Sequence, residues 1–174
     1  MGKSLSRSLD LPSLGRVDIL AQELALLQDK GKRRIAFLGS RHVPVVAIHL
    51  VELIARSLAQ EGHSIITSGS QGVNAAVIRG VLEVDPSLLT VLLPQSLERQ
   101  VPEIRDQLDE VLHLVEKIEN DDLPLPIASS LCNQEIISHC DQLICFAFHD
   151  IETLLASCNN AEEMGKVVSL MFFD

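Results

Sequence analysis

Two segments of the same construction restrict most strongly what this chain can fold into. Each is a run of apolar, partly β-branched residues that ends in a turn containing glycine and leads into a helical pattern. The segments are Ile35-Ala-Phe-Leu-Gly-Ser-Arg41 and Ile65-Ile-Thr-Ser-Gly-Ser-Gln-Gly-Val-Asn74. A glycine at a strand end allows close approach to the main chain, and the helix that follows offers unpaired N–H groups. A strand, a turn and a helix in this order predict an α/β protein whose turns face an anion.

The rest of the chain continues this alternation of strands and helices. We expect strands over 33–39, 63–67, 88–93, 111–115, 142–148 and 167–173. The helical patterns cover 17–30, 45–60, 74–84, 95–110, 127–139 and 152–164. Near-continuous apolar strands that alternate with helices predict a mostly parallel sheet with helices on both faces, the Rossmann-like class of α/β fold. Ligands of such sheets bind at the carboxyl ends of the strands, near the switch in strand order.

The size and composition fit a single domain. The chain has 174 residues, of which 47% are apolar, and this is enough material for a sizeable core. No apolar run approaches the roughly 20 residues that cross a bilayer. We therefore expect a flexible tail over 1–14, one domain over 15–174, no membrane contact and a cytoplasmic location.

Metal and thiol chemistry find no support in the sequence. The cysteines form no C-x-x-C pair and lie in apolar surroundings, and they are Cys132, Cys140, Cys145 and Cys158. The six histidines are scattered, without the spacing of a zinc site. We predict buried thiols, no metal site and no cofactor.

The candidate groups for an anion lie in the two turns, neither of which matches G-x-G-x-x-G or the P-loop. Arg41 either takes phosphate oxygens in a bidentate fork or is a solvated arginine at the start of a helix. Asn74 either contacts a base or ribose hydroxyl or only stabilises the turn. The serines either donate hydrogen bonds to phosphate or cap the helices, and they are Ser40, Ser68 and Ser70. The glycines expected to mark the floor of the pocket are Gly39, Gly69 and Gly72.

Five motifs in one order carry a resemblance to a known family. They are Gly39-Ser-Arg41, the turn Ser68-Gly-Ser-Gln-Gly-Val-Asn74, Leu89-Thr-Val-Leu-Leu-Pro94, Asn133-Gln-Glu-Ile-Ile-Ser138 with Cys140-Asp141, and Ala161-Glu-Glu-Met-Gly-Lys166. From about Ile35 onward the chain resembles the DNA-processing protein A family, DprA or Smf, within a Rossmann-like group that includes the LOG phosphoribohydrolases. The resemblance implies nucleotide or nucleic-acid binding, as in a DNA recombination mediator, and adds Asn133 to the candidate binding residues.

The chain departs from the catalytic motifs of that group. Where LOG hydrolases show Pro-Gly-Gly-x-Gly-Thr-x-x-Glu, it has Phe148-His-Asp-Ile-Glu-Thr-Leu-Leu155, and Cys132 stands where the resemblance places an arginine. A His149-Asp150 pair in this loop is more often a surface feature than a catalytic one. We therefore assign no catalytic residue and predict a non-enzymatic binding protein. The alternatives are a hydrolase of nucleotides or nucleoside derivatives and a ligand-sensing scaffold with a degenerate pocket.

Charge and aromatic content argue against a large nucleic-acid surface. The formal net charge is −10, and residues 98–122 hold nine acidic side chains against three basic ones. The chain has no Trp or Tyr to stack on bases. A local basic patch could still bind single-stranded DNA, and its members are Lys30, Lys32, Arg33, Arg34 and Arg41. The expected partners are thus a nucleotide or single-stranded DNA, and a protein.

The last predicted strand favours a homodimer. Phe172 and Phe173 are adjacent, so the alternation of a strand places one ring on each face of the sheet. Contact with a second copy would cover whichever ring is exposed.

Overall fold

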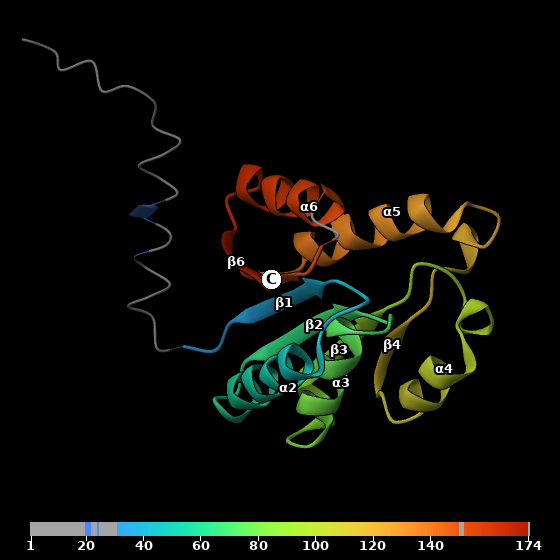
Figure 1. The fold of residues 1–174 in the computed structure, drawn as a ribbon, viewed down its shortest axis with the longest axis horizontal. Coiled ribbons are helices and arrows are strands. Elements are labelled where there is room, and N and C mark those ends of the chain that lie inside the picture. Colours follow the sequence, from blue (N-terminus) through green and yellow to red (C-terminus); the bar gives the residue numbers. More distant parts are fainter. Residues whose placement is uncertain (1–19, 22–23, 25–30, 150–151, 174) are drawn as a thin grey trace, which may run out of the picture. The chain divides into compact units, whose positions relative to one another are not determined.

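The computed structural model describes residues 20–21, 24, 31–149 and 152–173 (Figure 1). The chain divides into two units, Met1–Lys30 and Gly31–Asp174. In the first unit Leu20, Ala21 and Leu24 are helical, in agreement with part of the helix predicted over 17–30. The rest of that helix and the tail predicted over 1–14 lie outside the described residues.

The second unit contains one sheet of parallel strands. Within the described residues, six strands pair in the order β4-β3-β2-β1-β5-β6, and every pair is parallel. The strands are β1 Arg34–Gly39, β2 Ser64–Ser68, β3 Leu89–Leu92, β4 His113–Val115, β5 Gln142–Ala147 and β6 Val167–Phe172. The order changes direction at β1, whose neighbours are β2 and β5. The carboxyl ends of β1 and β5 are therefore the topological switch point, where open α/β sheets bind ligands.

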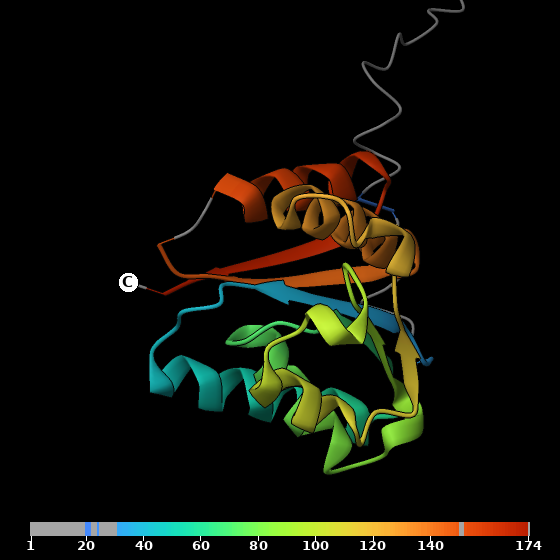
Figure 2. The ribbon, with the colours of Figure 1, turned by 90° about the vertical axis from the view of Figure 1, so that its right-hand side faces the viewer.

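The helices form a layer on each face of the sheet, as Figure 2 shows. One layer consists of α2 Val45–Gln60, α3 Val73–Leu82 and α4 Pro102–Leu108, and the other of α5 Leu125–Ser138 and α6 Glu152–Glu163. Strand β1 supplies both cores by alternation: Ile35 and Phe37 pack under α2 and α3, whereas Ala36 and Leu38 pack under α5 and α6. The predicted Rossmann-like α/β fold is confirmed.

The helix predicted over 95–110 is wrong in its first half. Gln95 and Ser96 are buried, a short 3₁₀ turn covers Leu97–Arg99, and α4 begins only at Pro102. Val101 is extended, with φ −65° and ψ 150°, because a residue before proline is disfavoured in the helical region. A tertiary contact also favours a non-helical conformation in this segment: Gln95 Nε2 donates a hydrogen bond to the Leu123 carbonyl at 3.0 Å.

The two phenylalanines at the end of β6 differ in environment. Phe173 stacks on Phe146 at a ring-centroid distance of 5.9 Å, and Phe146 in turn stacks on Phe37 at 6.2 Å. Phe172 is 53% exposed. The prediction that the two rings take different sides of the sheet agrees with this arrangement.

Candidate functional site

Ser40 ties together three turns at the switch point. Its backbone N–H donates to the Phe146 carbonyl of β5 at 3.0 Å, and its carbonyl accepts from the Val73 N–H at the start of α3 at 3.1 Å. Its hydroxyl oxygen accepts from the Phe148 N–H at 2.9 Å. The side chain is almost fully buried. Ser40 therefore positions the turns that follow β1, β2 and β5 relative to one another.

Glycines allow the first two turns to touch. Gly72 has φ +75°, and a Cβ at this position would lie 2.5 Å from the Ser40 carbonyl oxygen. A Cβ at Gly39 would lie 2.6 Å from the Val73 side chain. Gly69 packs against the Leu93 side chain in the same way. These glycines allow neighbouring segments to pack closely. The glycine pattern in the sequence does not distinguish this use from the floor of a pocket.

Asn74 is held inside the second turn. Its Nδ2 donates to Ser70 Oγ at 2.8 Å. Thr67 Oγ1 lies 3.1 Å from Asn74 Oδ1 and 2.9 Å from the Phe37 carbonyl oxygen. Asn74 is 5% exposed. Both ends of the amide are thus engaged by the protein, and the geometry agrees with the interpretation in which Asn74 stabilises the turn. Thr67, which links this turn to β1, was not among the predicted site residues.

Ser68 and Cys132 meet on the opposite face of the sheet. Ser68 Oγ lies 3.7 Å from Cys132 Sγ of α5, and this thiol also donates to the Leu92 carbonyl at 3.5 Å. Burial raises the pKa of Cys132 to about 11. A neutral thiol therefore occupies the position at which the family resemblance places a cationic arginine. Asn133 follows Cys132 on α5 and is half-buried.

The exposed cationic group of the switch point is Arg41. Arg41 and His42 are both exposed directly after Ser40. Among the described residues no carboxylate forms an ion pair with Arg41. A guanidinium without such a partner can take phosphate oxygens in bidentate geometry. His42 was not predicted as a site residue, although its position beside Arg41 in the turn could have indicated it.

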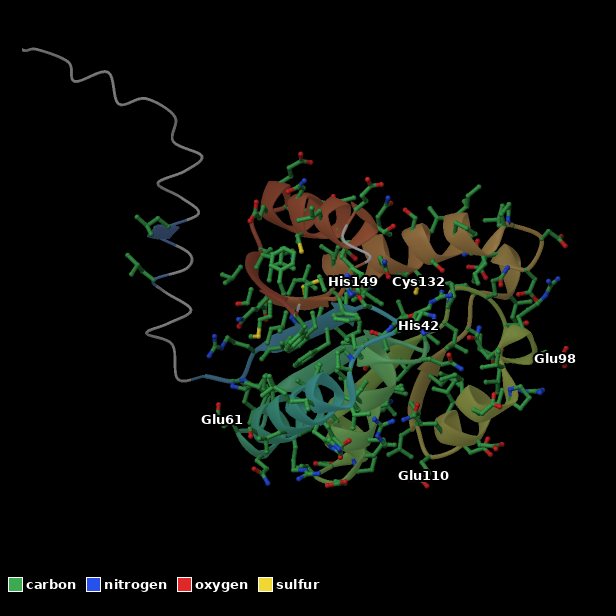
Figure 3. The ribbon with its side chains drawn as sticks, viewed as in Figure 1. His42, Glu61, Glu98, Glu110, Cys132 and His149 are labelled. Atoms are coloured by element: carbon green, nitrogen blue, oxygen red, sulfur yellow. The ribbon has the colours of Figure 1, made fainter. Side chains whose placement is uncertain are left out.

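His149 lies at the end of β5 in a strained conformation. Its φ is 60°, a left-handed value that residues other than glycine rarely adopt. The imidazole is exposed and packs against the Phe148 ring at a centroid distance of 4.0 Å. Figure 3 shows His149 and His42 well apart from Glu98 and Glu110, which mark the acidic segment around α4. Strain of this kind is often found at binding and catalytic sites. Its predicted neighbour Asp150 lies outside the described residues.

The predicted basic patch does not form around Arg41. Arg34 begins β1 and Arg41 lies two positions beyond its last residue, Gly39, so the six-residue strand separates them by about 20 Å. Arg34 is paired with Asp141 at 2.7 Å, and Arg33 donates to Gln142 Oε1 at 3.3 Å. Arg33 and Arg34 therefore lie at the amino end of β1, and Arg41 lies beyond its carboxyl end.

Metal chemistry is not indicated by the described part of the chain. No group of three or more His, Cys, Asp or Glu side chains gathers there as metal ligands would. All four cysteines are buried as free thiols. In the same residues, no helix is long and apolar enough to cross a membrane.

Comparison with known proteins identifies the fold class. No family model matches the sequence, and no similar sequence is found among characterised proteins. The structure resembles DNA processing protein A from Helicobacter pylori, with TM-score 0.65 and 21% identity, over 79% of this chain and 64% of that one. It also resembles DNA processing protein A (DprA) from Streptococcus pneumoniae, with TM-score 0.52 and 15% identity, over 80% and 59%. A third similar structure is the molybdenum cofactor carrier protein of Chlamydomonas reinhardtii, with TM-score 0.55 and 17% identity, over 80% and 76%.

These likenesses establish a DprA-like, Rossmann-like fold. The chain spans less than two thirds of the length of either DNA processing protein A. At identities of 15 to 21%, they describe the fold and do not by themselves carry a function.

Proposed function

We propose that this chain binds the phosphate groups of single-stranded DNA or of a nucleotide at the carboxyl edge of β1, β2 and β5, and that it does so without catalysing a reaction. The observation that carries the proposal is the exposed Arg41, which has no carboxylate partner in the described residues, at the topological switch point. Ser40 and Gly72 support it because they fix the turn from which Arg41 projects.

The fold neighbours favour DNA as the source of the phosphate. The H. pylori protein binds single-stranded DNA. Over 79% of its own length, the present chain has the same fold as that protein. Electrostatics limit the affinity, because a chain of net charge −10 repels a polyanion except where a cation is presented locally. We therefore expect weak binding that falls steeply with salt. A cytoplasmic location is proposed on the sequence grounds given above.

The test is fluorescence anisotropy with a labelled oligonucleotide of about 20 nucleotides, at about 50 mM and about 200 mM salt. We expect Arg41→Ala to weaken binding at least about tenfold, since a hydrogen bond to a charged group contributes about 1.5–3 kcal/mol and about 1.4 kcal/mol is a factor of ten. The control is Arg105→Ala, which removes an exposed arginine of α4 instead. No binding at low salt, or equal loss in the two variants, would refute the DNA proposal.

A nucleotide-specific protein, either a sensor or a hydrolase, is the second candidate. The strained backbone of His149 at the end of β5 favours it, because such strain persists where the surroundings constrain a residue for a purpose. The test is the thermal shift with mononucleotides and cyclic dinucleotides, followed by an assay for free base released from nucleoside monophosphates. Stabilisation by one nucleotide without base release indicates a sensor, and base release indicates a hydrolase.

A further inference from the structure

The sheet face that carries α5 and α6 is open beside α5. In the described part of the chain, three helices pack on the other face of the sheet and these two on this one. Leu114 of the edge strand β4 packs in the core under α2, α3 and α4, so the alternation of the strand turns Val115 towards the α5 face. Val115 is 38% exposed there. The α5 face is therefore incompletely covered at β4.

A cavity of about 400 Å³ lies in this opening. Its apolar floor is formed by Ile66 of β2, Leu92 of β3 and Val115 of β4. Arg34 and Ser64 also line it, and each is the first residue of its strand, so the cavity extends to the amino ends of β1 and β2. The site proposed for phosphate lies beyond the carboxyl ends of the strands. The cavity is thus a separate site, and its volume is within the range of about 300–1,000 Å³ that small-molecule sites occupy.

The charged side chains of the cavity are already paired within the protein. Arg34 Nη2 donates to Asp141 Oδ1 at 2.7 Å, and Lys117 Nζ donates to Glu135 Oε2 at 2.8 Å. The bond to Glu135 holds the pKa of Lys117 above its ordinary value, which keeps this pair charged at neutral pH. A charged ligand would lose its hydration without finding a guanidinium or a carboxylate of the lining that lacks a partner. The cavity therefore favours an uncharged ligand.

Three uncharged polar groups of the lining are free to bond to such a ligand. They are the hydroxyls of Ser64 and Thr90 and the imidazole of His139, and none of them makes a side-chain hydrogen bond with the described residues. A hydroxyl both donates and accepts, and so does a neutral imidazole. The parallel register places Thr90 directly beside Ile66, so polar and apolar side chains adjoin on the sheet face. The matching ligand has an apolar body with donors and acceptors at its edge.

We propose that this cavity binds an uncharged heteroaromatic molecule of one or two fused rings. The face of the ring would lie on the apolar floor, and its edge would bond to Ser64, Thr90 and His139. An alkyl chain would cover the floor but leave these polar groups unpaired. A sugar would pair them but leave the floor without an apolar partner. The proposal does not depend on the phosphate site, because it uses none of the residues of that site.

A titration of the full chain followed by the NMR signals of its backbone amides tests the class of ligand. The probe is quinazolinone, an uncharged fused ring that has an N–H donor, a carbonyl and a ring nitrogen. We expect shifts in β2, β3, β4 and α5 with a Kd of about 1 mM, as is usual for a molecule of this size. Naphthoate, which has the same number of rings but carries a charge, should bind at least about tenfold more weakly. Hexanol and glucose should also bind more weakly than quinazolinone.

Substitutions in the cavity test its position. Thr90→Phe fills the space above the floor with a residue that suits a strand, and it should weaken quinazolinone binding at least about tenfold. The matched control is Thr153→Phe, which adds the same ring at an exposed position of α6. Ser64→Ala and His139→Ala remove one edge group each without adding bulk. Each should weaken binding about threefold to tenfold, the usual contribution of a single hydrogen bond.

Oligonucleotide binding separates this proposal from the one made for the phosphate site. Thr90→Phe should leave the anisotropy titration unchanged, and Arg41→Ala should leave the quinazolinone shifts unchanged. The cavity proposal is overturned if quinazolinone causes no shift, or if its shifts lie in the turns after β1, β2 and β5 instead. It is equally overturned if naphthoate, hexanol or glucose binds more tightly, or if Thr153→Phe weakens binding as much as Thr90→Phe does.

Discussion

The segment formed by β2 and α3 is mostly buried in the domain, whereas the segment formed by β1 and α2 exposes its turn and much of its helix. Eight of the ten residues of α3 are buried, against four of the 16 residues of α2. At the start of α3, Asn74 Nδ2 donates to Ser70 Oγ of the preceding turn. In the turn before α2, Arg41 and His42 are exposed. Two segments built alike in sequence thus occupy opposite roles at one edge of the sheet.

A strand, turn and helix that occur twice in the chain therefore differ in what they contribute. The β2–α3 segment is the more rigid one, because Gly72 packs against the Ser40 carbonyl and Asn74 bonds to Thr67. The β1–α2 segment carries the exposed groups, namely the Arg41 guanidinium and the exposed apolar side chains of α2. Substitutions in the β2–α3 segment should therefore change the stability of the fold, and substitutions in the β1–α2 segment should change binding.

Gly72→Ala should destabilise the protein more than any other substitution considered. The methyl group would meet the Ser40 carbonyl in a turn where φ is already left-handed, so we expect a loss of about 3 kcal/mol or more. The control is Gly62→Ala, where φ is +85° but the nearest atom is the flexible Lys32 Cε at 3.1 Å. There we expect about 1 kcal/mol, the cost of the left-handed conformation alone. Urea unfolding measures both, and equal losses would mean that the two turns are not pressed together.

A smaller effect should separate Asn74 from Arg41. Asn74→Ala leaves Ser70 without its donor and should lower the free energy of unfolding by about 2 kcal/mol. Arg41→Ala should change it by less than about 0.5 kcal/mol, because the side chain is exposed and outside any described ion pair. Denaturant unfolding and oligonucleotide anisotropy on the same two samples give the comparison. A stability loss in the Arg41 variant would assign that arginine to the structure instead of to a ligand.

Local pattern was sufficient to predict most of the fold. The helix predicted over 45–60 has the bounds of α2, and Gly62 with its positive φ follows it. The apolar strands predicted the parallel sheet because buried parallel strands carry little alternation. The prediction over 95–110 failed partly because Pro102 disfavours a helical conformation at Val101. It also failed because the buried Gln95 bonds to the Asn120 carbonyl, 25 positions away. Such contacts leave no periodicity in the sequence.

The site was harder to predict because its residues act across the fold. The Ser40 hydroxyl bonds to the Phe148 N–H, which is 108 residues away, and no motif around Ser40 signals this. The separation of Arg33 and Arg34 from Arg41, in contrast, follows from the strand predicted over 33–39, because its two ends lie far apart. The outward leucines of α2 could not be predicted either, since helical spacing alone does not say which face meets the sheet.

The dependence of stability on pH should distinguish the two arginines near the ends of β1, and the expected difference is small. Hydrogen bonds from Arg34 hold the pKa of Asp141 below its usual value. A depressed pKa in the folded state means that the pair stabilises the protein above the pKa of the unfolded chain, about 4, and that this contribution is lost as pH falls through the lower folded value. Arg34 is 59% exposed, so solvent screening limits the contribution to about 0.5 kcal/mol. Asp141→Asn should therefore reduce the free energy of unfolding at pH 7 and make no difference at strongly acid pH, whereas Arg41→Ala should show no such dependence. A parallel pH profile for both variants would mean that the two ends of β1 share one electrostatic environment, contrary to the separation that the strand imposes.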